Sequence, residues 1–167
     1  MKIHIIGGPG SGKTVLARNI ASRLNCGILH LDDVAYCNGN YDMPTMREHR
    51  LAEVSRFTKY KAWVIEGVYF SWVGSGFKHC DKIFYLSVDK NIRKENILKK
   101  FEERFYLSVD DFEKQKARLL KANAEYDKLF DERISGFLKR FEDKVVVLNE
   151  IDLDVRELLA GTNGVSA

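Results

Sequence analysis

Eight consecutive residues near the start of the chain, GGPGSGKT at positions 7–14, match the spacing G-x-x-x-x-G-K-[ST]. Glycines let the backbone curl so that successive N–H groups point into one concavity, and a following helix adds unpaired donors and the positive end of its dipole. Such a loop binds phosphate oxygens, with Lys13 reaching the β- and γ-phosphates and the Thr14 hydroxyl coordinating Mg²⁺. The sequence therefore predicts ATP and Mg²⁺ as cofactors, a catalytic Lys13, and these nucleotide-binding residues: Gly7, Gly8, Gly10, Ser11, Gly12, Lys13 and Thr14.

Two other interpretations of this glycine run are a structural turn and a dinucleotide loop. A structural turn is disfavoured because the run lies between an expected strand and an expected helix, where the phosphate loop requires it. A dinucleotide loop needs G-x-G-x-x-G, and starting from Gly8 and Gly10 the third glycine position holds Lys13. A nucleotide phosphate site remains the interpretation that the spacing favours.

Acidic residues follow two of the expected strands. Asp32 and Asp33 come after the second strand, and Glu66 comes after the third. In an open parallel sheet ligands bind beyond the carboxyl ends of the strands, so a carboxylate at either place can hold Mg²⁺ or accept a proton from a substrate hydroxyl. The alternative is a structural role for these acids, since aspartate is common as a cap at turns.

A basic segment follows the fourth expected strand, with five cations and three glutamates between positions 93 and 104. Phosphoryl transfer needs cations that close over the γ-phosphate and neutralise the charge of the transition state. Arg93 and Arg104 are the leading candidates for this catalytic role because a guanidinium can fork onto phosphate. The alternative for each cation is a solvated helix face.

The elements that must position these residues alternate between short apolar runs and helical patterns. A helix is expected over 13–24, another after Pro44 with Thr45 and Glu48 as a capping box, and a third after the cap Asp89. Ser108 with Asp111 can cap a fourth. The five expected strands cover residues 2–6, 28–31, 62–65, 82–88 and 144–148.

This alternation predicts an α/β fold, the three-layer P-loop NTPase fold with a five-stranded, mainly parallel sheet and helices on both faces. With 167 residues, of which 45% are hydrophobic, the chain can bury one core, so a single domain over 1–167 is expected. Within it we expect an acceptor-binding segment at about 36–60 and a helical lid at about 90–125.

Composition excludes several classes of protein. No apolar run approaches the roughly 20 residues of a membrane helix, and the first residues lack a signal-peptide layout. The net charge of +3 is too small to indicate nucleic acid as a partner. Three widely spaced cysteines match neither a disulfide framework nor a metal site, so we expect reduced thiols and a cytoplasmic location. Whether the protein is a monomer or a dimer is left open.

Taken together, GGPGSGKT, HLDDV and WVIEGVY, followed by a fourth strand and a basic helix, resemble the adenylate-kinase-like P-loop kinases, most closely the bacterial DNA topology modulation protein group. The resemblance covers nearly the whole chain and places Glu66 beside Mg²⁺, where we also expect Thr14 and Asp32. It also implies a substrate- or metal-facing Asp33, which we expect to be catalytic with Asp32 as the alternative, and a lid containing Arg93 and Arg104. Nucleoside-monophosphate kinases commonly carry an arginine where this chain has Val68-Tyr69-Phe70, which favours a neutral or hydroxyl acceptor.

Two functional hypotheses follow. The first is an ATP-dependent small-molecule kinase that transfers the γ-phosphoryl group to an acceptor by in-line displacement. The second is a nucleotide-binding regulatory ATPase that acts on DNA or a protein partner. Acceptor-dependent ATP turnover would support the first hypothesis, and salt-dependent retention of DNA would support the second. GTP as the donor is disfavoured because the chain has no clear N-K-x-D motif.

Overall fold

The computed structural model describes residues 1–37, 41–102, 109–149 and 154–160. Its five strands form one sheet in the order β2-β3-β1-β4-β5, and every pair of neighbours is parallel. The predicted fold class is therefore confirmed, with the sheet wholly rather than mainly parallel. The strands are β1 (Lys2–Gly7), β2 (Gly27–His30), β3 (Trp63–Gly67), β4 (Lys82–Leu86) and β5 (Val145–Leu148).

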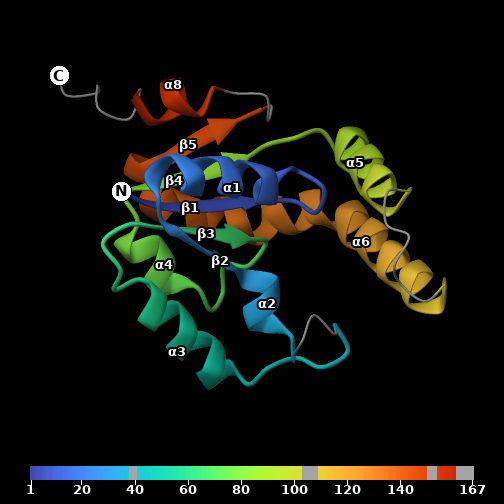
Figure 1. Cartoon of the computed structure of the whole chain (residues 1–167). Helices are drawn as coiled ribbons and strands as arrows, with labels where there is room; N and C mark the ends of the chain where they lie inside the picture. The colour runs from blue at the N-terminus through green and yellow to red at the C-terminus, as the bar shows by residue number, and fades with distance from the viewer. Residues whose placement is uncertain (38–40, 103–108, 150–153, 161–167) are drawn as a thin grey trace.

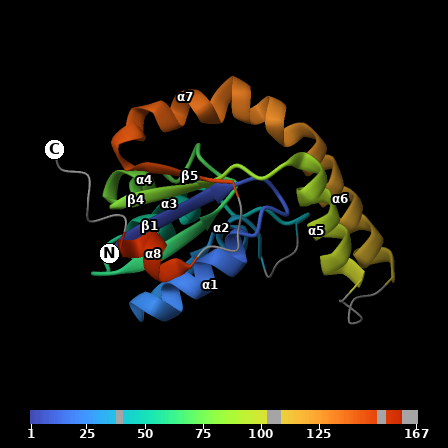
Figure 2. The ribbon, with the colours of Figure 1, turned by 90° about the horizontal axis from the view of Figure 1, so that it is seen from above.

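Helices cover both faces of the sheet, which gives three layers (Figures 1 and 2). Helix α1 (Lys13–Leu24) and helix α8 (Val155–Ala160) pack on one face, where Ile5, Val64 and Phe84 supply the sheet's side of the core. The other face carries a second core around Trp63 and Ile65. Successive residues of β3 thus point to opposite faces and both are buried, as expected for a central parallel strand.

The remaining helices flank the second core and the carboxyl edge of the sheet. A short π-helical turn, Phe130–Ile134, continues α6 into α7, and a 3₁₀ segment, Lys139–Lys144, leads into β5. Helices α4 and α7 lie on the side of the sheet opposite α1 (Figure 2). The bounds are α2 (Leu31–Ala35), α3 (Arg47–Phe57), α4 (Gly74–His79), α5 (Lys90–Glu102), α6 (Val109–Leu129) and α7 (Ser135–Leu138).

Of two predicted helix caps, one is confirmed and the other is corrected. The Asp89 carboxylate accepts hydrogen bonds from the backbone N–H groups of Asn91 (2.7 Å) and Ile92 (3.4 Å), so Asp89 caps α5 as predicted. The capping box at Thr45 and Glu48 is wrong, because α3 begins at Arg47 and the Thr45 hydroxyl donates to the carbonyl of Val34 at 2.7 Å instead. The Thr45 hydroxyl thus donates to a carbonyl from another segment instead of accepting from a local backbone N–H.

Two further expectations need correction or lie outside the described residues. Leu31 begins helix α2 rather than ending β2. Helix α4 was not among the expected helices. The predicted cap at Ser108 lies outside the described residues. Within those residues, no helix is both long and apolar enough to cross a membrane.

Candidate active site

The phosphate loop lies where β1 meets α1, and its backbone conformation depends on glycine. Gly10 and Gly12 have φ angles of +77° and +87°, in the left-handed region that side chains rarely adopt. A Cβ atom on Gly10 would come within 2.2 Å of the Arg93 carbonyl oxygen on α5, so the loop is also packed too closely for a side chain there. The Asn96 side chain donates to the Gly10 carbonyl oxygen at 2.9 Å, which ties α5 to the loop.

Lys13 is folded back over this loop. Its Nζ donates to the Gly8 carbonyl oxygen at 2.8 Å, and the residue is only 9% exposed. Burial lowers the pKa of Lys13, although the nearby carboxylates of Glu66 and Asp32 oppose that effect. The Ser11 hydroxyl is also buried and has no hydrogen-bond partner among the described residues. The loop thus holds a buried cation and an unpaired hydroxyl next to its backbone donors.

Glu66 joins the loop to the sheet. Its Oε1 accepts a hydrogen bond from the Thr14 hydroxyl at 3.1 Å and lies 2.7 Å from His30 Nδ1. Burial raises the pKa of Glu66, but the hydrogen bond from His30 and the charge of Lys13 outweigh it, so the pKa lies below its ordinary value. The hydrogen bond to Glu66 raises the pKa of His30 in spite of burial. Glu66 is therefore an anion beside Thr14.

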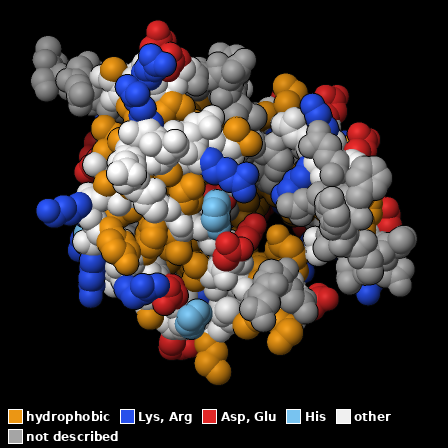
Figure 3. Space-filling model, in the orientation of Figure 1, with side chains coloured by type: hydrophobic (Ala, Val, Ile, Leu, Met, Phe, Trp, Pro, Cys, Tyr) orange, Lys and Arg blue, Asp and Glu red, His pale blue; other side chains and the backbone are white. Residues whose placement is uncertain are grey.

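The contact between His30 and Glu66 was not predicted. The two residues are register partners in the pairing of β2 with β3, and side chains that face each other across parallel strands lie on the same face. To predict this contact from the sequence, one would have to know that β2 and β3 are neighbours in the sheet. In Figure 3, basic, histidine and acidic side chains gather near the middle of the face, over the region where Figure 1 shows the start of α2.

Asp32 and Asp33 lie in the first turn of α2, and both are exposed. Their surroundings differ. The Asp32 carboxylate accepts a hydrogen bond from the Tyr69 hydroxyl at 2.9 Å, and its charge acts on Lys13. The charge of Asp33 acts instead on His30. Burial, followed by the charge and hydrogen bond of Asp32, raises the pKa of Tyr69, so this hydroxyl remains a donor.

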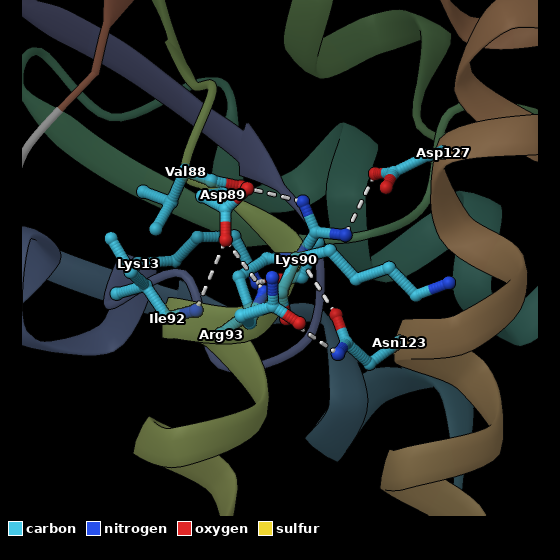
Figure 4. A network of polar contacts seen from close by, with 10 residues as sticks. Lys13, Val88, Asp89, Lys90, Ile92, Arg93, Asn123 and Asp127 are labelled. Atoms are coloured by element: carbon cyan, nitrogen blue, oxygen red, sulfur yellow. Dashed lines mark hydrogen bonds and ion pairs between the residues drawn. The ribbon is translucent and has the colours of Figure 1, made fainter.

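Arg93 is buried beside the loop, at 3% exposure, in a polar network that connects α5 to α6 (Figure 4). Its guanidinium donates to the Val88 carbonyl oxygen at 2.6 Å, to Asn123 at 2.7 Å and to Asp127 at 2.7 Å. It also lies 5.2 Å from the centroid of the Tyr126 ring. The alternative of a solvated helix face is therefore wrong for Arg93.

Arg104, the other predicted lid cation, lies outside the described residues. Another arginine, on helix α6, joins this helix to the segment that follows α2. Arg118 on α6 donates to the Tyr41 carbonyl oxygen and to the Tyr36 hydroxyl, both at 3.1 Å. Its guanidinium lies 5.3 Å and 4.8 Å from the centroids of the Tyr36 and Tyr41 rings, and 3.9 Å from the Asp42 carboxylate. We call this cluster the tyrosine clasp.

A small pocket of about 160 Å³ lies between the phosphate loop and α6. Its lining is apolar apart from one carboxylate and one phenol, and it contains no lysine or arginine. The Tyr126 hydroxyl is buried without a hydrogen-bond partner among the described residues, and burial raises its pKa. The lining residues are Pro9, Val68, Ala122, Glu125, Tyr126 and Leu129.

The same arrangement of parallel strands, helices and phosphate loop occurs in other proteins. Similar solved structures include a gluconokinase from Sinorhizobium meliloti 1021 (14% identity, TM-score 0.54, covering 97% of this chain and 91% of that one). A shikimate kinase from Bacteroides thetaiotaomicron has 14% identity and a TM-score of 0.57, with 98% and 94% coverage. A shikimate kinase from Acinetobacter baumannii in complex with shikimate has 17% identity and a TM-score of 0.53, with 99% and 95% coverage.

The chain thus has the fold of the P-loop kinases over nearly its whole length. No protein-family model matches the sequence. No curated protein matches it either.

Proposed function

We propose that this protein is an ATP-dependent small-molecule kinase that transfers the γ-phosphoryl group of Mg-ATP to a hydroxyl acceptor. The observation that carries the proposal is the pairing of Thr14 with Glu66 at 3.1 Å directly beside the buried Lys13. The motifs described above also lead us to propose membership of the bacterial DNA topology modulation group. In the P-loop kinase fold, these three side chains lie where a nucleotide's phosphates and their metal would be held.

The phosphate loop and Lys13 bind the phosphates of ATP, the phosphoryl donor. Backbone N–H groups of the glycine-rich turn and of the first turn of α1 point at the phosphate oxygens. On nucleotide binding the Lys13 ammonium exchanges its contact with the Gly8 carbonyl oxygen for the β- and γ-phosphates, whose negative charge offsets the effect of burial on the ammonium. Arg93, held rigidly by Asn123 and Asp127, supplies a second fixed positive charge beside the loop.

Thr14 and Glu66 fit a magnesium ion. Mg²⁺ prefers oxygen ligands and is usually held by one or two carboxylates together with substrate phosphates. The Thr14 hydroxyl and the anionic Glu66 are such ligands, and no cluster of three or more histidine, cysteine or acidic residues occurs in the described part of the chain. When bound, the ion would neutralise charge between the β- and γ-phosphates. His30 keeps Glu66 ionised and oriented for this role.

Acceptor activation falls to Asp32 or Asp33, and the contacts favour Asp32. It lies within electrostatic reach of Lys13 and accepts a hydrogen bond from the Tyr69 hydroxyl, whereas the charge of Asp33 acts on His30. A carboxylate held in this way can accept the hydroxyl proton as the acceptor oxygen attacks phosphorus and the bond to the leaving nucleoside diphosphate breaks. Asp32 is thus proposed as the catalytic carboxylate in place of Asp33, and Asp32 is no longer proposed as a magnesium ligand.

The acceptor itself carries no carboxylate or phosphate group. The pocket beside Pro9 and Val68 contains no lysine or arginine, and its one charged residue is Glu125. Two arginines of the neighbouring helices α5 and α6 are engaged, Arg93 with Asp127 and Arg118 in the tyrosine clasp. An anionic acceptor would therefore meet an apolar wall and a carboxylate, which costs desolvation energy without a compensating ion pair. A neutral or amine-bearing hydroxyl compound fits this lining.

Phosphorus NMR of the protein with Mg-ATP tests both the proposed kinase function and the proposed class of acceptor. Pools of nucleosides, sugars and amino alcohols are compared with pools of hydroxy acids and nucleoside monophosphates. We expect a new phosphoester signal with a neutral or amine-bearing pool, and we expect it to be absent from Lys13→Ala but present in the surface control Lys59→Ala. A product formed only with acids would overturn the acceptor class. ATP turnover that no pool alters would overturn the kinase function and favour the regulatory ATPase.

A further inference from the structure

A second cavity lies apart from the phosphate loop. It measures about 410 Å³, within the range of small-molecule sites, and opens between the segment that follows β3 and the helical stretch from Phe130 to Lys144. Its lining shares no residue with the pocket at Pro9 and includes none of the proposed catalytic residues. The lining residues are Phe70, Arg133, Gly136, Phe137 and Arg140.

The helical stretch presents these residues on one side. Arg133, Phe137 and Arg140 come from consecutive π-helical, α-helical and 3₁₀ segments, and all three line the cavity. Phe137 is anchored from behind, since its ring packs edge-on against the fully buried Phe77 at 4.9 Å between centroids. A Cβ atom on Gly136 would meet nothing within 4 Å, so the backbone there forms an open floor.

Phe70 forms the opposite wall. Its ring centroid lies 5.9 Å from that of Phe137, with 53° between the ring planes, so the two rings make an apolar corner rather than a closed stack. The Arg140 guanidinium lies 5.8 Å from the Phe137 centroid. A flat apolar group can lie in this corner between ring surfaces and the bare backbone of Gly136.

The two arginines that line the cavity favour a ligand with a negative charge. Arg133 and Arg140 are both exposed, and within the described residues neither takes part in an ion pair. The adjacent Glu132 is engaged with Lys128 at 3.8 Å. Guanidinium groups bind phosphate and carboxylate oxygens through paired donors, and two of them flanking one aromatic ring set up a positive rim around an apolar floor.

We propose that this cavity is a second ligand site, which binds a small organic anion with a flat apolar body and a phosphate or carboxylate group. The rings of Phe70 and Phe137 hold the body, and Arg133 and Arg140 hold the anionic group. The site does not depend on the phosphate loop or on bound ATP, and the inference stands independently of the proposed kinase function.

Binding of 1-naphthyl phosphate, measured by isothermal titration calorimetry and by protein NMR, tests this assignment. The neutral 1-naphthol and inorganic phosphate serve as partial ligands, and phenylacetate as the carboxylate arm. We expect naphthyl phosphate to bind at least about tenfold more tightly than 1-naphthol or inorganic phosphate, since charge-assisted hydrogen bonds and aromatic packing act together. Binding should persist in Lys13→Ala, which separates this cavity from the phosphate loop.

Two variants identify the residues. The double variant Arg133→Gln/Arg140→Gln should bind naphthyl phosphate at least about tenfold more weakly, while the matched control Arg23→Gln/Arg156→Gln, on the opposite face, should stay within about twofold. Gly136→Leu fills open space without positive-φ strain and should block the cavity in a folded protein. Undetectable binding by the unmodified protein, equal binding by all variants, or loss of binding in Lys13→Ala would each overturn the proposal.

Discussion

At the scale of single residues, the two adjacent aspartates of α2 differ in what they contact. The Asp32 carboxylate accepts a hydrogen bond from the Tyr69 hydroxyl at 2.9 Å, while the charge of Asp33 acts on His30. Local sequence cannot separate two neighbours of the same type, because each could face the cleft. The separation depends on Tyr69, which is 37 positions away along the chain.

Asp32→Asn should lower the turnover number for phosphoryl transfer by at least about a hundredfold, because the amide cannot accept the acceptor's proton. Asp33→Asn should lower it by less than about fivefold. Single-turnover kinetics with the acceptor found by phosphorus NMR would measure both, with circular dichroism to verify folding. A larger loss in Asp33→Asn would favour Asp33 as the catalytic base, and equal losses would contradict the assignment to Asp32 alone.

The pair of His30 and Glu66 predicts a pH dependence of stability. His30 has a raised pKa, so its contribution is fully present below the ordinary value of 6.5 and is lost as pH rises through the folded-state pKa. Glu66 has a lowered pKa, so its contribution is present above 4.5 and is lost as pH falls through the folded-state pKa. The two contributions therefore overlap fully between pH 4.5 and 6.5.

His30→Gln should consequently destabilise the protein most in that window, by about 1 kcal/mol, and less at pH 8.5. Urea unfolding curves at several pH values would measure the difference in the free energy of unfolding from the unmodified protein. The exposed His79 on α4 provides the control through His79→Gln, whose difference should stay nearly constant over the same range. A difference for His30→Gln that does not change with pH would contradict the pairing.

At the scale of elements, the tyrosine clasp joins helix α6 to the segment after α2. Arg118 donates to the Tyr41 carbonyl oxygen and to the Tyr36 hydroxyl. Tyr36 also contributes to raising the pKa of Tyr69, the residue that donates to the Asp32 carboxylate. The tyrosine clasp therefore lies within electrostatic reach of the residue that orients the proposed catalytic carboxylate. The tyrosine clasp connects the expected lid, 90–125, with the expected acceptor segment, 36–60.

Arg118→Ala should loosen this segment and expose Tyr36 and Tyr41 to protease. We expect cleavage by chymotrypsin at these tyrosines to become at least about fivefold faster, since two hydrogen bonds and two cation–π contacts are lost. Mass spectrometry of the early fragments would locate the cuts. Lys121→Ala, which removes an exposed cation from the same helix, should leave the rate unchanged, and an unchanged rate in Arg118→Ala itself would show that the clasp does not restrain the segment.

At the scale of the whole molecule, His4 lies in the middle of the core. It belongs to the central strand β1, is fully buried, and stacks on Phe77 with 3.9 Å between ring centroids. Neither ring nitrogen has a hydrogen-bond partner among the described residues. Burial lowers the pKa of His4 to about 3 from 6.5.

The unfolded chain therefore binds a proton at His4 between pH 6.5 and about 3 while the folded protein does not, so this group makes stability fall as pH drops through that window. His4→Phe should remove a slope of about 1.4 kcal/mol per pH unit. It should also leave stability at pH 7.5 equal or higher, because two unpaired buried nitrogens disappear. Denaturant unfolding between pH 4 and 7.5 would measure this, and parallel curves for the two proteins would contradict it.

Sequence alone determined the features that depend on local chemistry. Strand, glycine turn, helix start, Lys13 and Thr14 follow one another within 13 positions, so backbone conformation and phosphate-binding chemistry can be inferred together. The parallel sheet also follows from local pattern, because strands buried on both faces are apolar throughout. Glu66 was identified in the same way, as an acid at the end of an apolar strand.

Only the tertiary structure decided which distant groups meet. Arg93 has the sequence setting of a surface cation, yet Asn123 and Asp127, more than 29 positions away, compensate its burial. Thr45 has a capping partner three residues on, yet it bonds the carbonyl of Val34 because α2 folds back beside it. Arg118 and the cavity at Phe70 likewise depend on how α6 and its continuation cross the sheet. Hydrogen bonds and burial between remote segments depend on how the helices and strands pack together. The spacing of residues along the chain does not show this packing.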